Sequence, residues 1–129
     1  MTDLFKINFK NEDIIKILNK IKEFNWSKIS SSKTWVMGTN PDKLKELCEY
    51  WIEEYDWVKD QDYLNSFNQY KSNVDDLKLH FVLEKSKGIT SYPLVLLHGW
   101  PGSVSEFHNI IPMLTEKSGK ISFDVIAPS

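Results

Sequence analysis

The spacing of hydrophobic residues changes once along the chain, near residue 69. The clearest run before that point follows the intervals i, i+3, i+4, i+7, i+8 and i+11, and it comprises Leu44, Leu47, Cys48, Trp51, Ile52 and Tyr55. These intervals place the side chains on one face of an α-helix. Asn40 and Pro41 supply a capping residue and a first-turn proline. The pattern therefore predicts a helix that begins at residue 41.

Two more helices are predicted in the first half of the chain. Asn11 can cap the first, whose apolar face holds Ile14, Ile17, Leu18 and Ile21. The second spans residues 56–67, with Trp57, Leu64 and Phe67 inward. Residues 4–9 alternate weakly and suggest a short extended arm. Residues 25–38 show no clear period, and we interpret Trp26 and Trp35 there as anchors docked onto another surface.

From residue 69 the period becomes two, which is typical of strands. Residues 70–74, a turn at Asp75-Asp76 and a second alternating run predict an antiparallel hairpin. The apolar face of the second strand is expected to hold Leu77, Leu79, Phe81 and Leu83. His80 falls on the opposite face with Lys78 and Val82, and we interpret it as structural.

Residues 94–97 are four consecutive apolar residues, Leu-Val-Leu-Leu, and they predict a strand buried on both faces. Two glycines and a proline then break the chain, and Ser103-x-x-Glu106 forms a capping box. The helix expected after it has these residues inward: Val104, Phe107, Ile110, Ile111 and Leu114. Pro112 should bend that helix or end it early. Residues 123–128 predict a second buried parallel strand. A strand, a sharp turn and a helix form half of a βαβ unit, and open α/β sheets place their chemistry at such turns.

Composition narrows the function classes. The net charge of −2 gives no indication of a nucleic-acid partner. Cys48 is the only cysteine, so no internal disulfide can form, and its place on an apolar helix face marks it as a core residue. No run approaches the ~18 apolar residues of a membrane-spanning helix, and residues 1–20 have no signal-peptide core. We therefore expect a cytoplasmic protein, with peripheral membrane association left open. No metal-binding or nucleotide-binding motif is present, so no cofactor is expected.

The turn after residue 97 carries a family resemblance. His98-Gly99-Trp100-Pro101 resembles the His-Gly-x-Pro oxyanion motif of α/β-hydrolases, and the extension to Gly102-Ser103 is the form common in epoxide hydrolases. The stretches 51–57 and 123–129 look like the microsomal and juvenile-hormone branch of that family. The resemblance implies an α/β fold, with an N-terminal helical region over 1–68 and a truncated hydrolase sheet over 69–129. That sheet would contain the hairpin and two parallel strands.

The resemblance also implies roles for the residues of the turn. The backbone N–H of Trp100 would be one oxyanion donor, and its indole would line the substrate pocket. His98 and Gly99 would shape the turn, and Pro101 would fix its conformation. Gly102 would be a further residue of the motif or the pocket. A cis Trp100–Pro101 peptide bond is implied as well. The alternative is that these residues form only a strand-to-helix connection.

The remaining chemistry of the family is missing from these 129 residues. The resemblance implies an aspartate nucleophile on an elbow, a histidine base and two cap-domain tyrosines. No Gly-x-Ser-x-Gly or matching aspartate elbow occurs, Asp124 begins a strand, and His80, His98 and His108 fall in the wrong positions for the base. We expect the N-terminal portion of an enzyme that hydrolyses small-molecule epoxides to diols, inactive as this chain.

Two other interpretations remain open at this point. One is a non-catalytic remnant or interaction module, and the other is a haloalkane dehalogenase-like hydrolase, which the helical extension disfavours. In the strand order that the resemblance implies, the far edge of strand 94–97 has no neighbour. We therefore expect a fragment, or one piece of a split protein, in which a partner or a missing C-terminal part covers that edge.

Overall fold

The computed structural model describes residues 2–29, 34–36, 38–116 and 121–129. The chain divides into two compact units, which are described separately: a helical unit of residues 8–61 and a sheet unit of residues 1–7 and 62–129. The sequence suggested a family domain boundary between residues 68 and 69, and that boundary stays a prediction. The contacts instead separate the units after residue 61 and join the first seven residues to the sheet unit.

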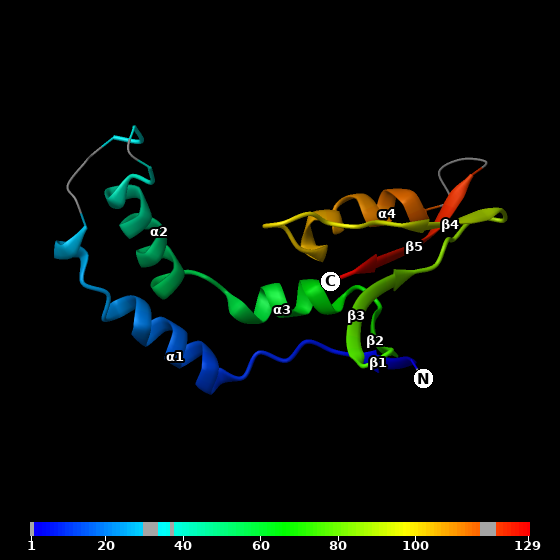
Figure 1. Cartoon of the computed structure of the whole chain (residues 1–129), viewed down its shortest axis with the longest axis horizontal. Helices are drawn as coiled ribbons and strands as arrows, with labels where there is room; N and C mark the ends of the chain where they lie inside the picture. The colour runs from blue at the N-terminus through cyan, green and yellow to red at the C-terminus, as the bar shows by residue number, and fades with distance from the viewer. Residues whose placement is uncertain (1, 30–33, 37, 117–120) are drawn as a thin grey trace. The chain divides into compact units, whose positions relative to one another are not determined.

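The helical unit contains α1 (Asn11–Lys22), the 3₁₀ turn η1 (Trp26–Lys28), α2 (Pro41–Glu53) and the first half of α3 (Trp57–Asn65), as Figure 1 shows. The capping of α2 is as predicted, because Asn40 Oδ1 accepts hydrogen bonds from the N–H groups of Asp42 at 2.9 Å and Lys43 at 3.4 Å. The predicted cap of α1 is wrong: Asn11 is the first helical residue, and Lys10 precedes it without a side-chain bond.

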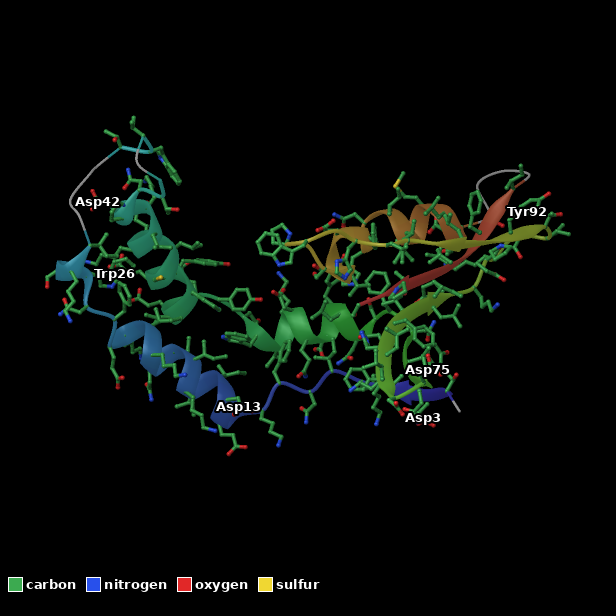
Figure 2. All side chains as sticks on the ribbon, viewed as in Figure 1. Asp3, Asp13, Trp26, Asp42, Asp75 and Tyr92 are labelled. Carbon is green, nitrogen blue, oxygen red and sulfur yellow. The ribbon has the colours of Figure 1, made fainter. Side chains whose placement is uncertain are left out.

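Aromatic rings gather between α2 and α3 within the helical unit. The rings of Trp51 and Trp57 stack with centroids 5.9 Å apart, and Tyr55 meets Trp57 edge-on at 5.1 Å. Trp26 also packs edge-on against Phe24, at 4.9 Å, and its docking onto another surface stays a prediction. Trp26, the first residue of η1, is labelled in Figure 2. Trp35 is 65% exposed and does not dock onto the described surface of this unit.

The sheet unit is built on five strands in the order β1-β2-β3-β5-β4. Their bounds are β1 Thr2–Phe5, β2 Gln69–Val74, β3 Leu77–Glu84, β4 Ser91–Val95 and β5 Ser122–Pro128. The hairpin of β2 and β3 is as predicted, with Asp75, labelled in Figure 2, in the left-handed region at φ 52°. The arm forms a strand only over residues 2–5, which pair with β2. β5 lies between β3, to which it is antiparallel, and β4, to which it is parallel.

The predicted apolar face of β3 is not the face that contains its most buried residue. Val82 is 1% exposed, whereas Leu77 on the apolar face is 75% exposed. Val82 pairs with the buried Ala127 of β5 and packs in one core with Phe67 and Ile111. Because α4 and Phe67 cover only this side, the face with Val82 is buried, and the alternate residues of β3 face outward.

β4 is likewise buried on one face, not on both as the apolar run predicted. Leu94 and Leu96 pack against the core, while Val95 is 55% exposed and Leu97 is 74% exposed. β4 also ends two residues earlier than predicted, although the N–H of Leu96 still donates to the carbonyl of Ile126 at 2.9 Å. The sheet therefore has one covered face and one open apolar face.

The single helix predicted after Ser103 is instead two short elements. A 3₁₀ turn, η2 (Val104–Phe107), precedes α4 (Ile110–Thr115), which lies beside β4 and β5 in Figure 1. Pro112 falls in the first turn of α4, where a missing N–H breaks no helical bond. Ile111 is buried as predicted, but Ile110 is exposed, and the other buried residues of this segment are His108 and Thr115.

His80 has the structural role that the sequence suggested. Its Nε2 lies 2.9 Å from Oε1 of Gln69, and its Nδ1 lies 2.6 Å from Oγ of Ser129. Gln69 is buried and also donates to the carbonyl of Leu64 at 2.7 Å. This network connects the end of α3 with β2, β3 and the residue after β5. Burial, followed by the nearby positive charge of Lys71, lowers the pKa of His80, so the neutral imidazole is the form that the network holds.

Two adjacent isoleucines allow a matched test of this core. Ile111 is 1% exposed and Ile110 is 45% exposed. Ile111→Ala should lower the free energy of unfolding by about 2–5 kcal/mol, because the change leaves a cavity. Ile110→Ala should cost less than about 1 kcal/mol, since it removes partly solvated atoms. Urea unfolding followed by circular dichroism measures both values, and equal losses would contradict this description of the core.

Candidate functional site

The candidate site is the turn that follows β4. β4 runs parallel to β5, so residues 96–103 leave the sheet at the carboxyl end of two parallel strands. This is the position at which open α/β sheets place ligands and reacting groups. The backbone bond from Leu96 to Ile126 holds the start of the turn against β5. The turn therefore projects from a fixed point of the sheet.

The backbone of the turn closes on itself. The N–H of Gly102 donates to the carbonyl of Gly99 at 2.8 Å, and Nδ1 of His98 lies 3.1 Å from the same oxygen. The peptide bond between Trp100 and Pro101 is cis, as predicted. The sequence placed His98, Gly99, Trp100, Pro101 and Gly102 in one turn, and the structure brings them together in that form.

Trp100 presents an unpaired backbone donor at the tip of this turn. Its N–H has no protein acceptor within hydrogen-bonding distance in the described part of the chain. The residue is 96% exposed, so the described residues build no wall around its indole. The position of the indole in a substrate pocket stays a prediction. The free N–H is the feature that gives the turn a chemical capability, because such a donor can stabilise developing negative charge.

Glu106 contacts the turn in a way that the sequence did not predict. A Cβ added to Gly102 would enter the Glu106 carboxylate and would come within 3.0 Å of the Gly99 carbonyl oxygen. The predicted capping box is only partly formed: Ser103 Oγ accepts from the N–H of Ser105 at 3.3 Å, and Glu106 folds back over Gly102 instead. Gly99, by contrast, has open space at its Cβ position. A side chain at position 102 would therefore have to displace the Glu106 carboxylate, whereas one at position 99 would meet nothing.

The other candidate groups of the sequence lie apart from the turn. Asp124, in β5, accepts from the N–H of Ser86 at 2.8 Å and from Nζ of Lys85 at 3.1 Å. These two bonds hold its pKa below the usual value and engage both carboxylate oxygens, so it is not poised as a nucleophile. His108 is buried in the core of the sheet unit, and His80 belongs to the network with Gln69.

Comparison with known proteins identifies the family. The family model for the epoxide hydrolase N terminus matches residues 2–107. The chain belongs to the epoxide hydrolase family. The expected resemblance is confirmed, and so is the expected α/β-hydrolase fold with an N-terminal helical region and an incomplete sheet.

Relatives within the epoxide hydrolase family include insect and mammalian proteins. Juvenile hormone epoxide hydrolase 1 of Ctenocephalides felis is 36% identical over 130 residues, covering 97% of this chain and 28% of the relative. Epoxide hydrolase 1 of Oryctolagus cuniculus is 36% identical over 134 residues, covering 97% of this chain and 30% of the relative. The chain thus spans less than a third of the length of these relatives.

Solved structures of the family have the same fold. The crystal structure of juvenile hormone epoxide hydrolase from Bombyx mori matches all of this chain with a TM-score of 0.90 and 33% identity, covering 36% of that structure. The epoxide hydrolase of Aspergillus niger matches with a TM-score of 0.86 and 25% identity, covering 35% of that structure. Among helices in the described ranges, none has the length and apolar character needed to cross a bilayer.

The contact of Glu106 with Gly102 leads to a prediction about the turn. Gly102→Ala should lower the free energy of unfolding by about 1 kcal/mol, because the added methyl group displaces the Glu106 carboxylate and crowds the Gly99 carbonyl. Gly99→Ala is the matched control and should cost less, since its Cβ meets nothing. A cycle with Glu106→Ala should recover part of the loss in the double mutant. Purely additive losses in urea unfolding would refute the contact.

Proposed function

We propose that these residues form the N-terminal portion of an epoxide hydrolase, in which the backbone N–H of Trp100 is one of the oxyanion donors. The substrate is a small epoxide, which water converts to a vicinal diol without a cofactor. The observation that carries the proposal is the unpaired Trp100 N–H, on a turn closed by the Gly102–Gly99 bond, at the carboxyl end of β4. The printed names of the relatives support the epoxide as substrate.

The remaining catalytic groups would have to come from elsewhere than these 129 residues. In the proposed reaction an aspartate attacks an epoxide carbon to form an ester, and water activated by a histidine cleaves that ester. Asp124 is held by Ser86 and Lys85, and His80 is held by Gln69 and Ser129. An oxyanion donor alone does not open an epoxide, so we expect the purified chain to leave styrene oxide unchanged relative to buffer.

A chimera tests the role of Trp100 directly. Residues 1–129 would replace the matching segment of Epoxide hydrolase 1 of Oryctolagus cuniculus, and hydrolysis of styrene oxide would be measured. Trp100→Pro removes the N–H and should lower kcat about 10²- to 10³-fold, the typical cost of one oxyanion donor. Trp100→Ala keeps the N–H and should lose less than about tenfold. Equal losses in two folded variants, checked by circular dichroism, would assign the effect to the indole, and turnover by the isolated chain would refute the account of the missing groups.

A second candidate function, as an interaction module, is favoured by the free edge of β4. β4 is the last strand in the sheet order and pairs with β5 on one side only. Val95 in this strand and Leu97, two residues after its end, are both exposed. An unpaired strand with apolar side chains is a template for another strand. In this interpretation a partner, or a further part of the protein, covers this edge, and the chain contributes structure without catalysis.

The open edge predicts self-association of the isolated chain. At high concentration the chain should form dimers or larger species by pairing along β4, because burial of the apolar edge is favourable. Leu97→Lys should shift the equilibrium toward monomer by at least about tenfold in the dissociation constant, since pairing would then bring two lysines close together. Leu77→Lys, on the equally exposed end of β3, is the control. Analytical ultracentrifugation gives the answer, and a monomeric wild-type chain would exclude the edge as an interface.

A further inference from the structure

The backbone before Trp100 is held by the sheet, and the backbone after it leads into η2. On the first side, the N–H of Leu96 donates to the carbonyl of Ile126 at 2.9 Å. On the second side, η2 packs against the core of the sheet unit through Val104 and Phe107. A residue of η2 that contacts the turn therefore fixes the far side of the turn relative to the core.

Glu106 is the residue of η2 that makes this contact. It lies between the two core-facing residues of η2, and its N–H donates to the carbonyl of Ser103 at 3.1 Å. Its carboxylate occupies the space where a side chain at position 102 would begin, and the carbonyl oxygen of Gly99 lies 3.0 Å from the same point. The carboxylate thus packs on the junction at which the N–H of Gly102 closes the turn onto Gly99.

The contact is one of shape. In the described part of the chain the Glu106 carboxylate makes no hydrogen bond or ion pair. The nearby hydroxyls bond elsewhere, because Ser103 Oγ accepts from the N–H of Ser105 at 3.3 Å and the two Oγ atoms lie 2.6 Å apart. The carboxylate fills the space left by the missing side chain of Gly102. A side-chain amide of the same shape would fill that space equally well.

We propose that Glu106 is a positioning residue for the oxyanion donor, in that its side chain packs on Gly102 and keeps the Trp100 N–H in a fixed direction. Trp100 and Pro101 are the two residues enclosed by the hydrogen bond from Gly102 to Gly99. A turn held at both ends leaves these two residues little freedom, so the donor stabilises negative charge without first reorganising. The inference rests on the proposed oxyanion role of Trp100, but the mobility of its N–H is measurable without catalysis.

The order parameter of the Trp100 amide, from nitrogen relaxation in the full 129-residue chain, measures this mobility. We expect about 0.85 in the wild-type chain, as in rigid backbone, and a fall toward the ~0.6 of flexible backbone in Glu106→Ala. Glu106→Gln keeps the shape of the side chain and should retain the wild-type value. Glu116→Ala removes an exposed carboxylate at the end of α4 and is the matched control, which should change nothing.

Three results would overturn the inference. A Trp100 amide that stays rigid in Glu106→Ala would show that the turn holds itself. Equal loosening in Glu106→Gln and Glu106→Ala would show that the charge, and not the packing, is what matters. Loosening of the completely buried Val125 in Glu106→Ala would assign the effect to the fold as a whole.

The same variants in the chimera with Epoxide hydrolase 1 of Oryctolagus cuniculus connect the direction of the donor to the rate. Glu106→Ala should lower kcat for styrene oxide about tenfold with KM nearly unchanged, because the donor acts on the transition state. Glu106→Gln should keep kcat within about twofold of the parent chimera. An unchanged kcat in Glu106→Ala, or a loss in KM alone, would overturn the positioning role. If Trp100→Pro leaves kcat unchanged, the proposed oxyanion role fails, whereas the order parameters still report whether Glu106 holds the turn.

Discussion

The sheet unit depends on β5, which joins two parts that do not otherwise pair. β5 lies antiparallel to β3 and parallel to β4, and its Val125 and Ala127 are completely buried. Among the described strands, β3 and β4 have no ladder with each other, so β5 provides the strand pairing between the hairpin and the strand before the turn. The pairing of Leu94 with Val125 closes a long loop, and the ladder bonds and the apolar area buried in this joint offset the entropy of that closure.

The sequence correctly predicted the elements that depend on interactions between residues close together in the chain. Spacing and capping gave α2 with its Asn40 cap, and alternation gave the hairpin. The sequence did not predict which face of a strand is buried, because burial depends on which helices and side chains pack against the sheet. Both faces of β3 carry apolar residues, and Val82 became the buried one only because α4 and Phe67 cover its side. The run from Leu94 to Leu97 predicts burial on both faces, although only one face of β4 has a covering element.

The candidate site shows the same division. A recognisable motif placed residues 98–102 in a turn and implied its cis peptide bond, which the structure contains. That the Trp100 N–H has no acceptor, and that Glu106 lies over Gly102, are three-dimensional facts without a local signal. His108 did have a signal that went unused: it precedes Ile111 by three residues and Thr115 by seven, and all three are buried. A polar residue at the helical spacing of a core face indicates a side chain that packs into the core, as the His108 ring does against Phe67.

The backbone of the turn would orient the proposed oxyanion donor before any other catalytic group is in place. Oxyanion stabilisation requires donors that are already oriented, because reorganisation during the reaction would cost the energy they supply. Here the bond from Leu96 to Ile126 fixes one side of the turn, and the bond from Gly102 to Gly99 closes the other. Neither bond involves a nucleophile or a base. The geometry of the donor is therefore a property of the sheet and the turn, so it forms with β5 in place, whatever supplies the remaining groups.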